Sequence, residues 1–299
     1  MTSRRPLSSG GDLLCGRRAQ YIQSMSPISF KHSKVDPPPV AMTEAPGQIQ
    51  MAIDSYLLSR VGASELTEFR VYRMWPPAVT IGRNQRWQRV IDEEVCRAHG
   101  WEWVRRPTGG GALLHLNEIN YAIVAPRGVL APQGQGEFRA VFDVIGHTLT
   151  AALHGMGYDP ELRFGDREDH IPQHGLCGRS ITGNEIALGD RKIIAAAQVI
   201  TPLGILQHGT IYLHAPGADD RFWPTTDAET GMGEFTQRWA DLGSRFDDRA
   251  WSETASEFER GFRQNFPAKS KPSSLTSDDW THVGQLSDTW NATGWHKSR

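Results

Sequence analysis

The chain has 299 residues, and 38% of them are hydrophobic, which is enough to bury a sizeable core in one large domain or two small ones. Its 32 basic and 34 acidic residues give a formal net charge of -2, so it has no broad positive field for nucleic acid or an anionic membrane. No apolar run is long enough to span a bilayer or to serve as a secretory signal.

The three cysteines, Cys15, Cys96 and Cys177, are odd in number and widely spaced. This spacing excludes a disulfide framework and a zinc knuckle, and it is typical of a protein in the reducing cytoplasm. We therefore expect a cytoplasmic protein without a metal site, whose partners are neither nucleic acid nor membrane.

The first segment in chain order, residues 1–45, is rich in Ser, Pro, Arg and Gly and has neither helical nor strand periodicity. We expect a disordered leader here. Met25 and Met42 are both candidate start residues, so part of this leader could lie upstream of the true start.

Apolar residues at helical spacing predict a helix from about residue 47 to residue 60. A strand-like segment over 68–75 follows, and the break Trp75-Pro76-Pro77 separates it from a short apolar run that stops at Gly82. These two runs predict a hairpin or a bent pair of strands.

Residues 89–100 predict a short amphipathic helix that ends at Gly100, with Cys96 as a small apolar filler inside it. Residues 101–126 predict a strand, a glycine turn, a strand, a short turn and a further strand. Helical spacing returns over 137–154.

Three more strand-like runs follow the polar loop over 165–179, and residues 249–266 predict another amphipathic helix. The runs are "NEIAL", "KIIAAAQVI" and "GILQHGTIYLH". Because the strands are joined by short links, they favour an antiparallel or mixed sheet over a parallel one. The predicted class is α+β, a mixed, mainly antiparallel sheet flanked by helices, and we expect the last residues to form a small appendage.

A glycine-rich segment, "RRPTGGGALLH" over Arg105–His115, is the first candidate for chemistry. Three consecutive glycines between two strands leave the backbone open to a ligand, and Arg105 and Arg106 beside them could bind a phosphate or carboxylate. It is no P-loop, because a strand and not a helix follows. The alternative is a flexible hairpin loop with solvated arginines and a structural His115.

Cys177 and Lys192 form the second constellation. Cys177 lies in the polar, glycine-flanked segment "HGLCGRS", where a thiol is accessible and a nearby cation would favour its thiolate. It is a candidate nucleophile. Lys192 at the start of a strand is by default a surface lysine. A third segment, Leu206–Leu213 ("LQHGTIYL"), is either a further part of the site or a buried strand with a glycine bulge.

Five segments taken in this order resemble the lipoate-protein ligase and octanoyltransferase family, whose catalytic domain is shared with biotin protein ligase. The resemblance covers about residues 47–265. It is specific because all five motifs keep their order. They are "MAIDSYLL" (Met51–Leu58), "FRVYRMWPPAVTIGRNQ" (Phe69–Gln85), "RRPTGGGALLH", "DRKIIAAAQ" (190–198) and "LQHGTIYL".

The resemblance implies a class II synthetase/biotin-ligase-like fold, with a catalytic domain over 46–266, a C-terminal appendage over 267–299 and an acyl tunnel beside the glycine loop. Cys177 matches the cysteine of the cysteine-dependent octanoyltransferases, and Lys192 matches the lysine that contacts the acyl carbonyl. The implied substrate-binding residues are Arg105, Arg106, Gly109, Gly110, Gly111, His115, Gln207, His208 and Gly209.

The implied activity is that of an octanoyl-[acyl carrier protein]:protein N-octanoyltransferase that needs no cofactor. The donor is acyl carrier protein, and the acceptor is a lipoyl-domain protein such as glycine cleavage H protein or a 2-oxoacid dehydrogenase E2 subunit. His115, His174 and His208 are candidate acceptors of the thiol proton.

Two departures from the family pattern keep two alternatives open. Ile194-Ala195-Ala196-Ala197 stands where the family usually has a glycine and a serine, and Leu116 stands where an acidic residue often follows the histidine. The alternatives are an ATP- and Mg2+-dependent lipoate-protein ligase and a noncatalytic acyl-binding paralogue.

Overall fold

The computed structural model describes residues 42–63, 66–116, 118–163, 185–189, 191–213 and 248–298. All of them belong to one compact unit of the chain, residues 37–299. Cys177 and His174 lie outside the described residues, as does the predicted leader up to residue 41.

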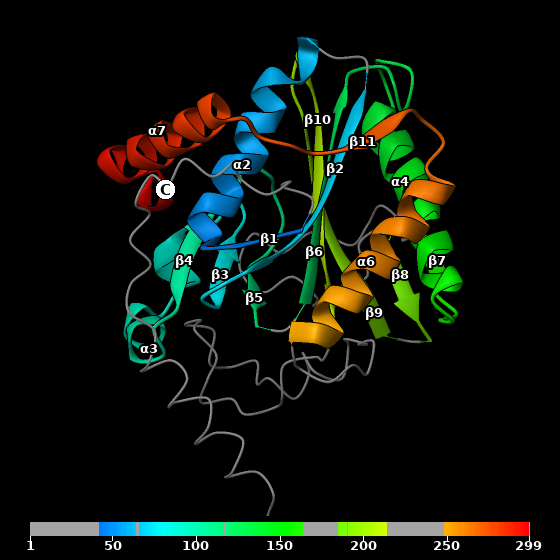
Figure 1. Cartoon of the computed structure of the whole chain (residues 1–299). Helices are drawn as coiled ribbons and strands as arrows, with labels where there is room; N and C mark the ends of the chain where they lie inside the picture. Colours follow the sequence, from blue (N-terminus) through cyan, green and yellow to red (C-terminus); the bar gives the residue numbers. More distant parts are fainter. Residues whose placement is uncertain are drawn as a thin grey trace, which may run out of the picture. The chain divides into compact units, whose positions relative to one another are not determined.

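The larger sheet of this unit has eight described strands, in the order β1-β2-β6-β10-β9-β8-β7, and β11 also pairs with β2 (Figure 1). Antiparallel pairing joins β2 to β6, β6 to β10, β10 to β9, β9 to β8 and β8 to β7. By contrast, β1 and β11 both run parallel to β2. The predicted mixed, mainly antiparallel sheet is confirmed. Its strands are β1 Met42–Ala45, β2 Thr67–Met74, β6 Glu118–Pro126, β7 Glu161–Arg163, β8 Glu185–Leu188, β9 Arg191–Ile200, β10 Gly204–Tyr212 and β11 Ser270–Pro272.

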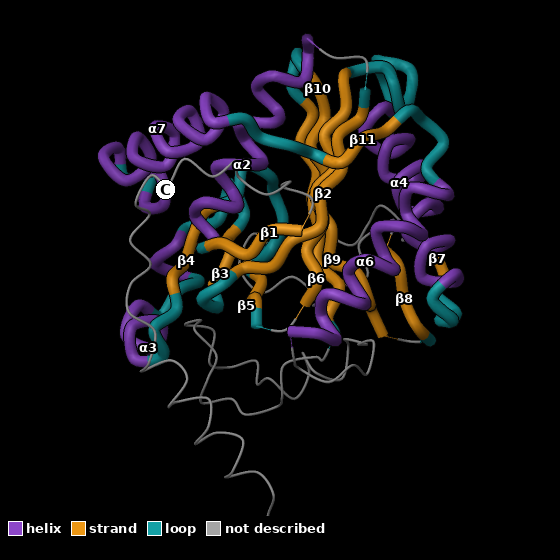
Figure 2. Tube along the Cα trace, in the orientation of Figure 1, coloured by secondary structure: helices purple, strands orange, loops and turns teal. Residues whose placement is uncertain are grey.

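A smaller three-stranded sheet has the order β4-β3-β5 (Figure 2). Strand β3 (Ala78–Ile81) is parallel to β4 (Glu102–Arg105) and antiparallel to β5 (Leu113–His115). The expected pairing of the run over 68–75 with the run after it is therefore wrong, because β2 and β3 belong to different sheets. Pro76 and Pro77 lack the N–H groups that a hairpin ladder needs, and the chain changes sheet at this point.

Helices cover both faces of the larger sheet (Figure 1). Helices α4 (Glu137–Gly155) and α6 (Asp248–Asn265) pack against each other on one face, and α2 (Gly47–Arg60) packs with α7 (Ser277–Thr293) on the other. The helices predicted over 47–60, 137–154 and 249–266 are confirmed. The other helical elements among the described residues are α3 Glu93–Ala98 and the single 3-10 turns η1 Val61–Ala63, η2 Trp87–Arg89 and η4 Trp295–Lys297.

Two elements depart from the sequence-based expectations. The last four residues of the predicted leader form β1, which gains order by pairing with β2 along its whole length. Helix α7 occupies most of the expected appendage, and Thr276 and Asp279 close its first turn as a reciprocal capping box.

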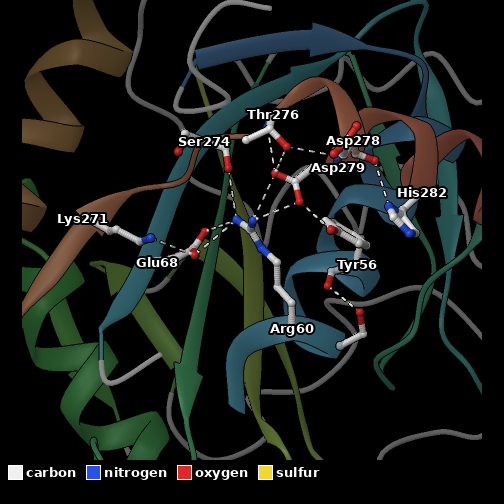
Figure 3. A network of polar contacts seen from close by, with 10 residues as sticks. Tyr56, Arg60, Glu68, Lys271, Ser274, Thr276, Asp278, Asp279 and His282 are labelled. Carbon is white, nitrogen blue, oxygen red and sulfur yellow. Dashed lines mark hydrogen bonds and ion pairs between the residues drawn. The ribbon is translucent and has the colours of Figure 1, made fainter. Parts of the chain in front are cut away.

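A network of polar contacts holds α7 on α2 (Figure 3). Arg60 at the end of α2 lies 3.3 Å from Asp279 and 3.0 Å from Glu68 of β2, so one guanidinium joins α7 to the sheet. The Tyr56 hydroxyl donates to the same Asp279 carboxylate, and the Tyr56 ring stacks on His282. The C-terminal segment is thereby tied to the helix that covers one face of the sheet.

Alternation along the strands divides the buried side chains of the larger sheet between its two faces. On β2, Phe69 belongs to the apolar cluster under α4 and α6, where its ring stacks on Phe262 at 3.9 Å between centroids. The next residue, Arg70, is equally buried but faces α2. One face of the sheet is thus an apolar core, and the other carries buried charge.

Candidate active site

A pocket lies between the two sheets, under α2. The larger sheet contributes the alanine run of β9 and the middle of β10, and the smaller sheet contributes β3, β5 and the glycine loop. Its lining is Met51, Tyr72, Met74, Thr80, Arg106, Gly110, Leu113, His115, Asn120, Ala195, Ala196, Ala197, His208, Gly209 and Thr210. Of the predicted site residues, the structure brings Arg106, Gly110, His115, His208 and Gly209 together here.

Arg106 holds the glycine loop in shape. One terminal nitrogen of its guanidinium donates to the Gly109 and Gly111 carbonyls at 2.8 Å each, and the other donates to the Thr80 hydroxyl at 2.8 Å. Gly110 has a φ of +90°, a backbone conformation that residues with a side chain rarely adopt. The guanidinium is buried among these partners, so in this structure it organises the loop backbone.

A second close approach fixes the loop from outside. The Gly110 carbonyl oxygen lies where a side chain on Gly82 would begin, only 2.0 Å from the position of a Cβ atom. The Arg83 N–H also donates to the Thr108 carbonyl at 2.8 Å. The segment after β3 therefore packs directly on the glycine loop, and Gly82 must be glycine for that contact.

Arg105, predicted to bind the ligand, does not line this pocket. Its side chain is fully buried and donates to the carbonyls of Gly82, Arg83 and Gln85 at 3.1, 3.1 and 2.7 Å, and to the His296 carbonyl at 3.1 Å. Strand alternation explains the difference, because neighbouring residues at a strand end point to opposite sides. Arg105 ties the C-terminal turn to the loop after β3.

A chain of buried polar side chains crosses from α2 to the glycine loop. Asp54 binds Arg70 at 2.6 Å and the His208 Nδ1 at 2.8 Å, and the His208 Nε2 lies 2.6 Å from the Thr108 hydroxyl. Thr108, Asp54 and Arg70 are fully buried, and His208 is 4% exposed. Both ring nitrogens of His208 are therefore occupied.

Burial and pairing set the charges of His208 and Asp54 in this polar network. Burial lowers the pKa of His208 below its ordinary value, and the positive charges of Arg106 and Arg70 lower it further. The Asp54 carboxylate raises this pKa but does not offset the decrease. Burial alone would raise the pKa of Asp54, but Arg70 and His208 outweigh it and hold that pKa below its usual range. A neutral His208 then donates from Nδ1 to Asp54 and accepts the Thr108 hydroxyl hydrogen at Nε2.

His115 forms a similar but looser set of contacts on the other side of the pocket. Its Nε2 lies 2.9 Å from the Thr80 hydroxyl, and its Nδ1 lies 3.3 Å from Glu118. Both described candidates for the thiol proton, His115 and His208, thus have both ring nitrogens facing neighbouring side chains.

Lys192 lies on the pocket face of the larger sheet because of a register shift. Ile194 pairs with Ile186, whereas Lys192 pairs with Ala187, so Lys192 and Ile194 face opposite sides of the sheet. Lys192 therefore shares the side of Ala195, which lines the pocket. Its ammonium group binds the carboxylate of Glu185, and the side chains are 10% and 6% exposed.

Gln207, predicted to contact the ligand, points away from this pocket. It pairs with Ile123 in the apolar core under α4, and its amide lies 3.5 Å from the Tyr121 hydroxyl. His208, the next residue, faces the pocket. Gly209 lines the pocket with its backbone, since a Cβ atom there would lie 2.6 Å from the Tyr121 hydroxyl.

Cys96 agrees with the expectation made of it. Cys96 is buried in an apolar cluster, and burial raises the pKa of its thiol to about 11, which confirms it as a filler. Within the described ranges, no group of three or more His, Cys, Asp or Glu side chains could hold a metal ion. No described helix is long and apolar enough to cross a membrane.

Sequence reasoning did not single out Asp54, Arg70, Thr108, Glu185 or Thr210. Asp54 carried one usable signal, because it is a charged residue on the apolar side of the helix motif "MAIDSYLL". Thr108 is identified only by its contact with His208, 100 residues later in the sequence, and Thr210 only by its place in the pocket wall.

Residues 46–219 match the family described as Lipoyl protein ligase A/B catalytic domain. An octanoyltransferase LipM of Symbiobacterium thermophilum is 30% identical over 262 residues, which cover 82% of this chain and 94% of that protein. The octanoyltransferase LipM of Staphylococcus aureus is 27% identical over 260 residues, covering 82% of this chain and 92% of that protein.

Two solved structures share the fold. The crystal structure of a lipoate-protein ligase A bound with ATP superposes with a TM-score of 0.68 at 20% identity and covers 86% of this chain and 96% of that one. A T. acidophilum protein with bound lipoic acid gives a TM-score of 0.67 at 19% identity and covers 86% and 98%.

Proposed function

Because the chain belongs to the lipoyl protein ligase A/B catalytic domain family, we propose that it is an octanoyl-[acyl carrier protein]:protein N-octanoyltransferase. It moves an octanoyl group from acyl carrier protein to a lysine of a lipoyl domain. The observation that carries this proposal is the 30% identity to an octanoyltransferase LipM over 94% of that protein's length.

The pocket supports an acyl substrate. Its lining is mainly apolar, and Gly110 and Gly209 contribute backbone without side chains to its wall. Ala195 and Ala197 of the alanine run put two methyl groups on one wall, whereas the Ala196 side chain packs against the apolar core on the other face of the sheet. The two methyl groups narrow the space that a glycine and a serine would leave, which favours a slim, unbranched acyl chain.

We assign the covalent step to Cys177 and the stabilisation of the carbonyl oxygen to Lys192. The Cys177 thiolate attacks the carrier thioester, the carrier thiol leaves, and the octanoyl group is held as an enzyme thioester. The acceptor lysine amine then attacks this thioester, loses a proton and displaces the Cys177 thiolate. Thioester exchange is nearly neutral and amide formation runs downhill, so no nucleotide is needed.

The acceptor we propose is a lipoyl-domain protein, such as glycine cleavage H protein or a 2-oxoacid dehydrogenase E2 subunit. We place the reaction in the cytoplasm, where a free thiol such as Cys177 stays reduced. Lys192 lies on the same side of the sheet as the pocket wall, and this geometry supports its role at the carbonyl end of the acyl chain.

The test is transfer without nucleotide. The full chain is incubated with octanoyl-acyl carrier protein and an unmodified lipoyl domain, and the acceptor is followed by intact mass. We expect the acceptor to gain one octanoyl group in the absence of ATP and Mg2+, and Lys192→Ala to slow this gain.

Two outcomes would replace the proposal. Transfer only from free octanoate or lipoate with ATP and Mg2+, undiminished by Cys177→Ser, would identify a ligase. Binding of the acyl group with no transfer under either condition would identify a noncatalytic acyl-binding protein.

A further inference from the structure

Thr210 carries a buried hydroxyl group that has no partner among the described residues. It lies in the middle of β10, is 1% exposed and lines the pocket. Its Oγ1 makes no hydrogen bond within the described part of the chain. A buried hydroxyl without a partner is unfavourable for folding, and one in a pocket wall is placed to donate to a ligand atom.

The surroundings of Thr210 are rigid. On either side of it along β10, His208 reaches Thr108 at 2.6 Å and the Tyr212 hydroxyl donates to the Leu114 carbonyl at 2.9 Å. These two contacts join the larger sheet to the glycine loop and to β5 of the smaller one. Thr210 lies between them, so its hydroxyl is held at a fixed depth in the pocket.

Thr210 also faces the same side of the sheet as Lys192. It pairs with Ala195 across the ladder, and paired residues in antiparallel strands share a face. The register shift in β9 brings Lys192 to that face as well. The two residues therefore lie on one face of the sheet, with Thr210 beside Ala195 and Lys192 three residues before Ala195 on β9.

We propose that the Thr210 hydroxyl is a second hydrogen-bond donor, beside Lys192, to the carbonyl oxygen of the octanoyl group. The inference rests on the proposed function and adds a residue to it. When a nucleophile bonds to the carbonyl carbon, the π pair of the C=O bond moves onto oxygen. Thr210 and Lys192 stabilise that oxyanion by hydrogen bonds and transfer no proton, and the C=O bond re-forms as the thiolate leaves.

The structure offers a matched pair of substitutions. Thr67 of β2 is also a fully buried threonine whose hydroxyl has no partner in the described ranges, but it lies outside the pocket. Thr210→Val and Thr67→Val each replace the hydroxyl by a methyl group of the same shape. Neither removes a hydrogen bond that the fold uses, so we expect neither to lower the urea midpoint of unfolding.

Octanoyl transfer from acyl carrier protein to a lipoyl domain is then measured at saturating donor. We expect kcat of Thr210→Val to fall on the order of 100-fold with KM little changed, the effect of losing one oxyanion donor in comparable sites. Thr210→Ser should stay close to the wild type, and so should Thr67→Val.

The inference is overturned if Thr210→Val transfers at the wild-type rate, or if Thr210→Ser is as slow as Thr210→Val. It is also overturned if Thr210→Val loses activity only in proportion to lost folded protein. If the wild-type chain itself transfers no octanoyl group, the proposed function fails, and this inference fails with it.

Discussion

Both faces of the larger sheet carry fully buried side chains, but those on one face are apolar and several on the other are charged. Under α4 and α6, side chains such as Phe69, Ile145 and Phe262 form an apolar core. Under α2, Asp54 and Arg70 are fully buried and bound to each other. An apolar contact tolerates exchange for a residue of similar volume, whereas each member of a buried polar chain requires its specific partners.

The comparison suggests what the polar face does. Burying an ion pair such as Asp54 and Arg70 contributes little net stability, because desolvation offsets the attraction. The pair instead fixes His208, which in turn fixes Thr108 in the glycine loop. We conclude that the apolar face stabilises the domain and that the polar face positions the pocket.

Removing one partner of the buried ion pair should have the largest effect on the free energy of unfolding. Asp54→Ala leaves the Arg70 guanidinium without its carboxylate and the His208 Nδ1 without its acceptor. We expect the free energy of unfolding to fall by about 3–5 kcal/mol. Urea unfolding followed by circular dichroism measures this, with Asp54→Asn as an intermediate control, and a loss below about 1 kcal/mol would contradict the argument.

Removing the contact at the other end of the buried polar network, between Thr108 and His208, should have a smaller effect on stability and a clear effect on the pocket. Thr108→Val removes the hydroxyl hydrogen that His208 Nε2 accepts, which leaves a buried acceptor unpaired at a cost of about 1–3 kcal/mol. We also expect KM for octanoyl-acyl carrier protein to rise, because the glycine loop loses its contact with β10. Thr108→Ser keeps the hydroxyl and should restore both values; equal behaviour of the two variants would show that the contact is unimportant.

The polar face should also respond to pH. The pKa of His208 lies below its ordinary value of 6.5, so the unfolded chain takes up a proton there before the folded chain does. Stability from the neutral ring is complete above pH 6.5 and decreases below it, by at most about 1.4 kcal/mol per pH unit.

Urea unfolding at pH 7.5, 6.5 and 5.5 checks this dependence. Burial lowers the pKa of His296 to about 4, so that group acts in the same direction and remains in the control. His208→Gln should therefore show a shallower fall than the wild type. Identical slopes would mean that His208 does not titrate as described.

The smallest effect is expected on the apolar face. Ile145→Val removes one methylene from a fully buried position in α4, and we expect a loss of about 0.5–1.5 kcal/mol with kcat and KM unchanged. Thermal or urea unfolding and the transfer assay check the two parts. A change in KM as large as that of Thr108→Val would erase the distinction between the faces.

Features of the fold that depend on local patterns were predictable from the sequence. The helix over 47–60 and the strand over 118–126 follow from spacing of apolar residues, which neighbouring residues set by themselves. Strand β1 has only four residues and is defined by its pairing with β2, so no local pattern indicated it. The separation of β2 from β3 likewise depends on partners that come later in the chain.

The site was predictable only in part, for the same reason. The glycine loop, His115 and His208 were found by their motifs, but Arg105 and Gln207 each lie next to a pocket residue and face away from it. A motif does not state which neighbour faces the ligand. Asp54 contacts His208 across 154 residues of sequence, so its role could not be inferred from spacing.

The central claim is that an octanoyl group is carried on Cys177 without nucleotide. The direct measurement is the intact mass of the full chain after incubation with octanoyl-acyl carrier protein in the absence of ATP. We predict an adduct of one octanoyl group that hydroxylamine removes and that Cys177→Ala abolishes. An unchanged mass in the wild type, or an adduct that persists in Cys177→Ala, would contradict the account.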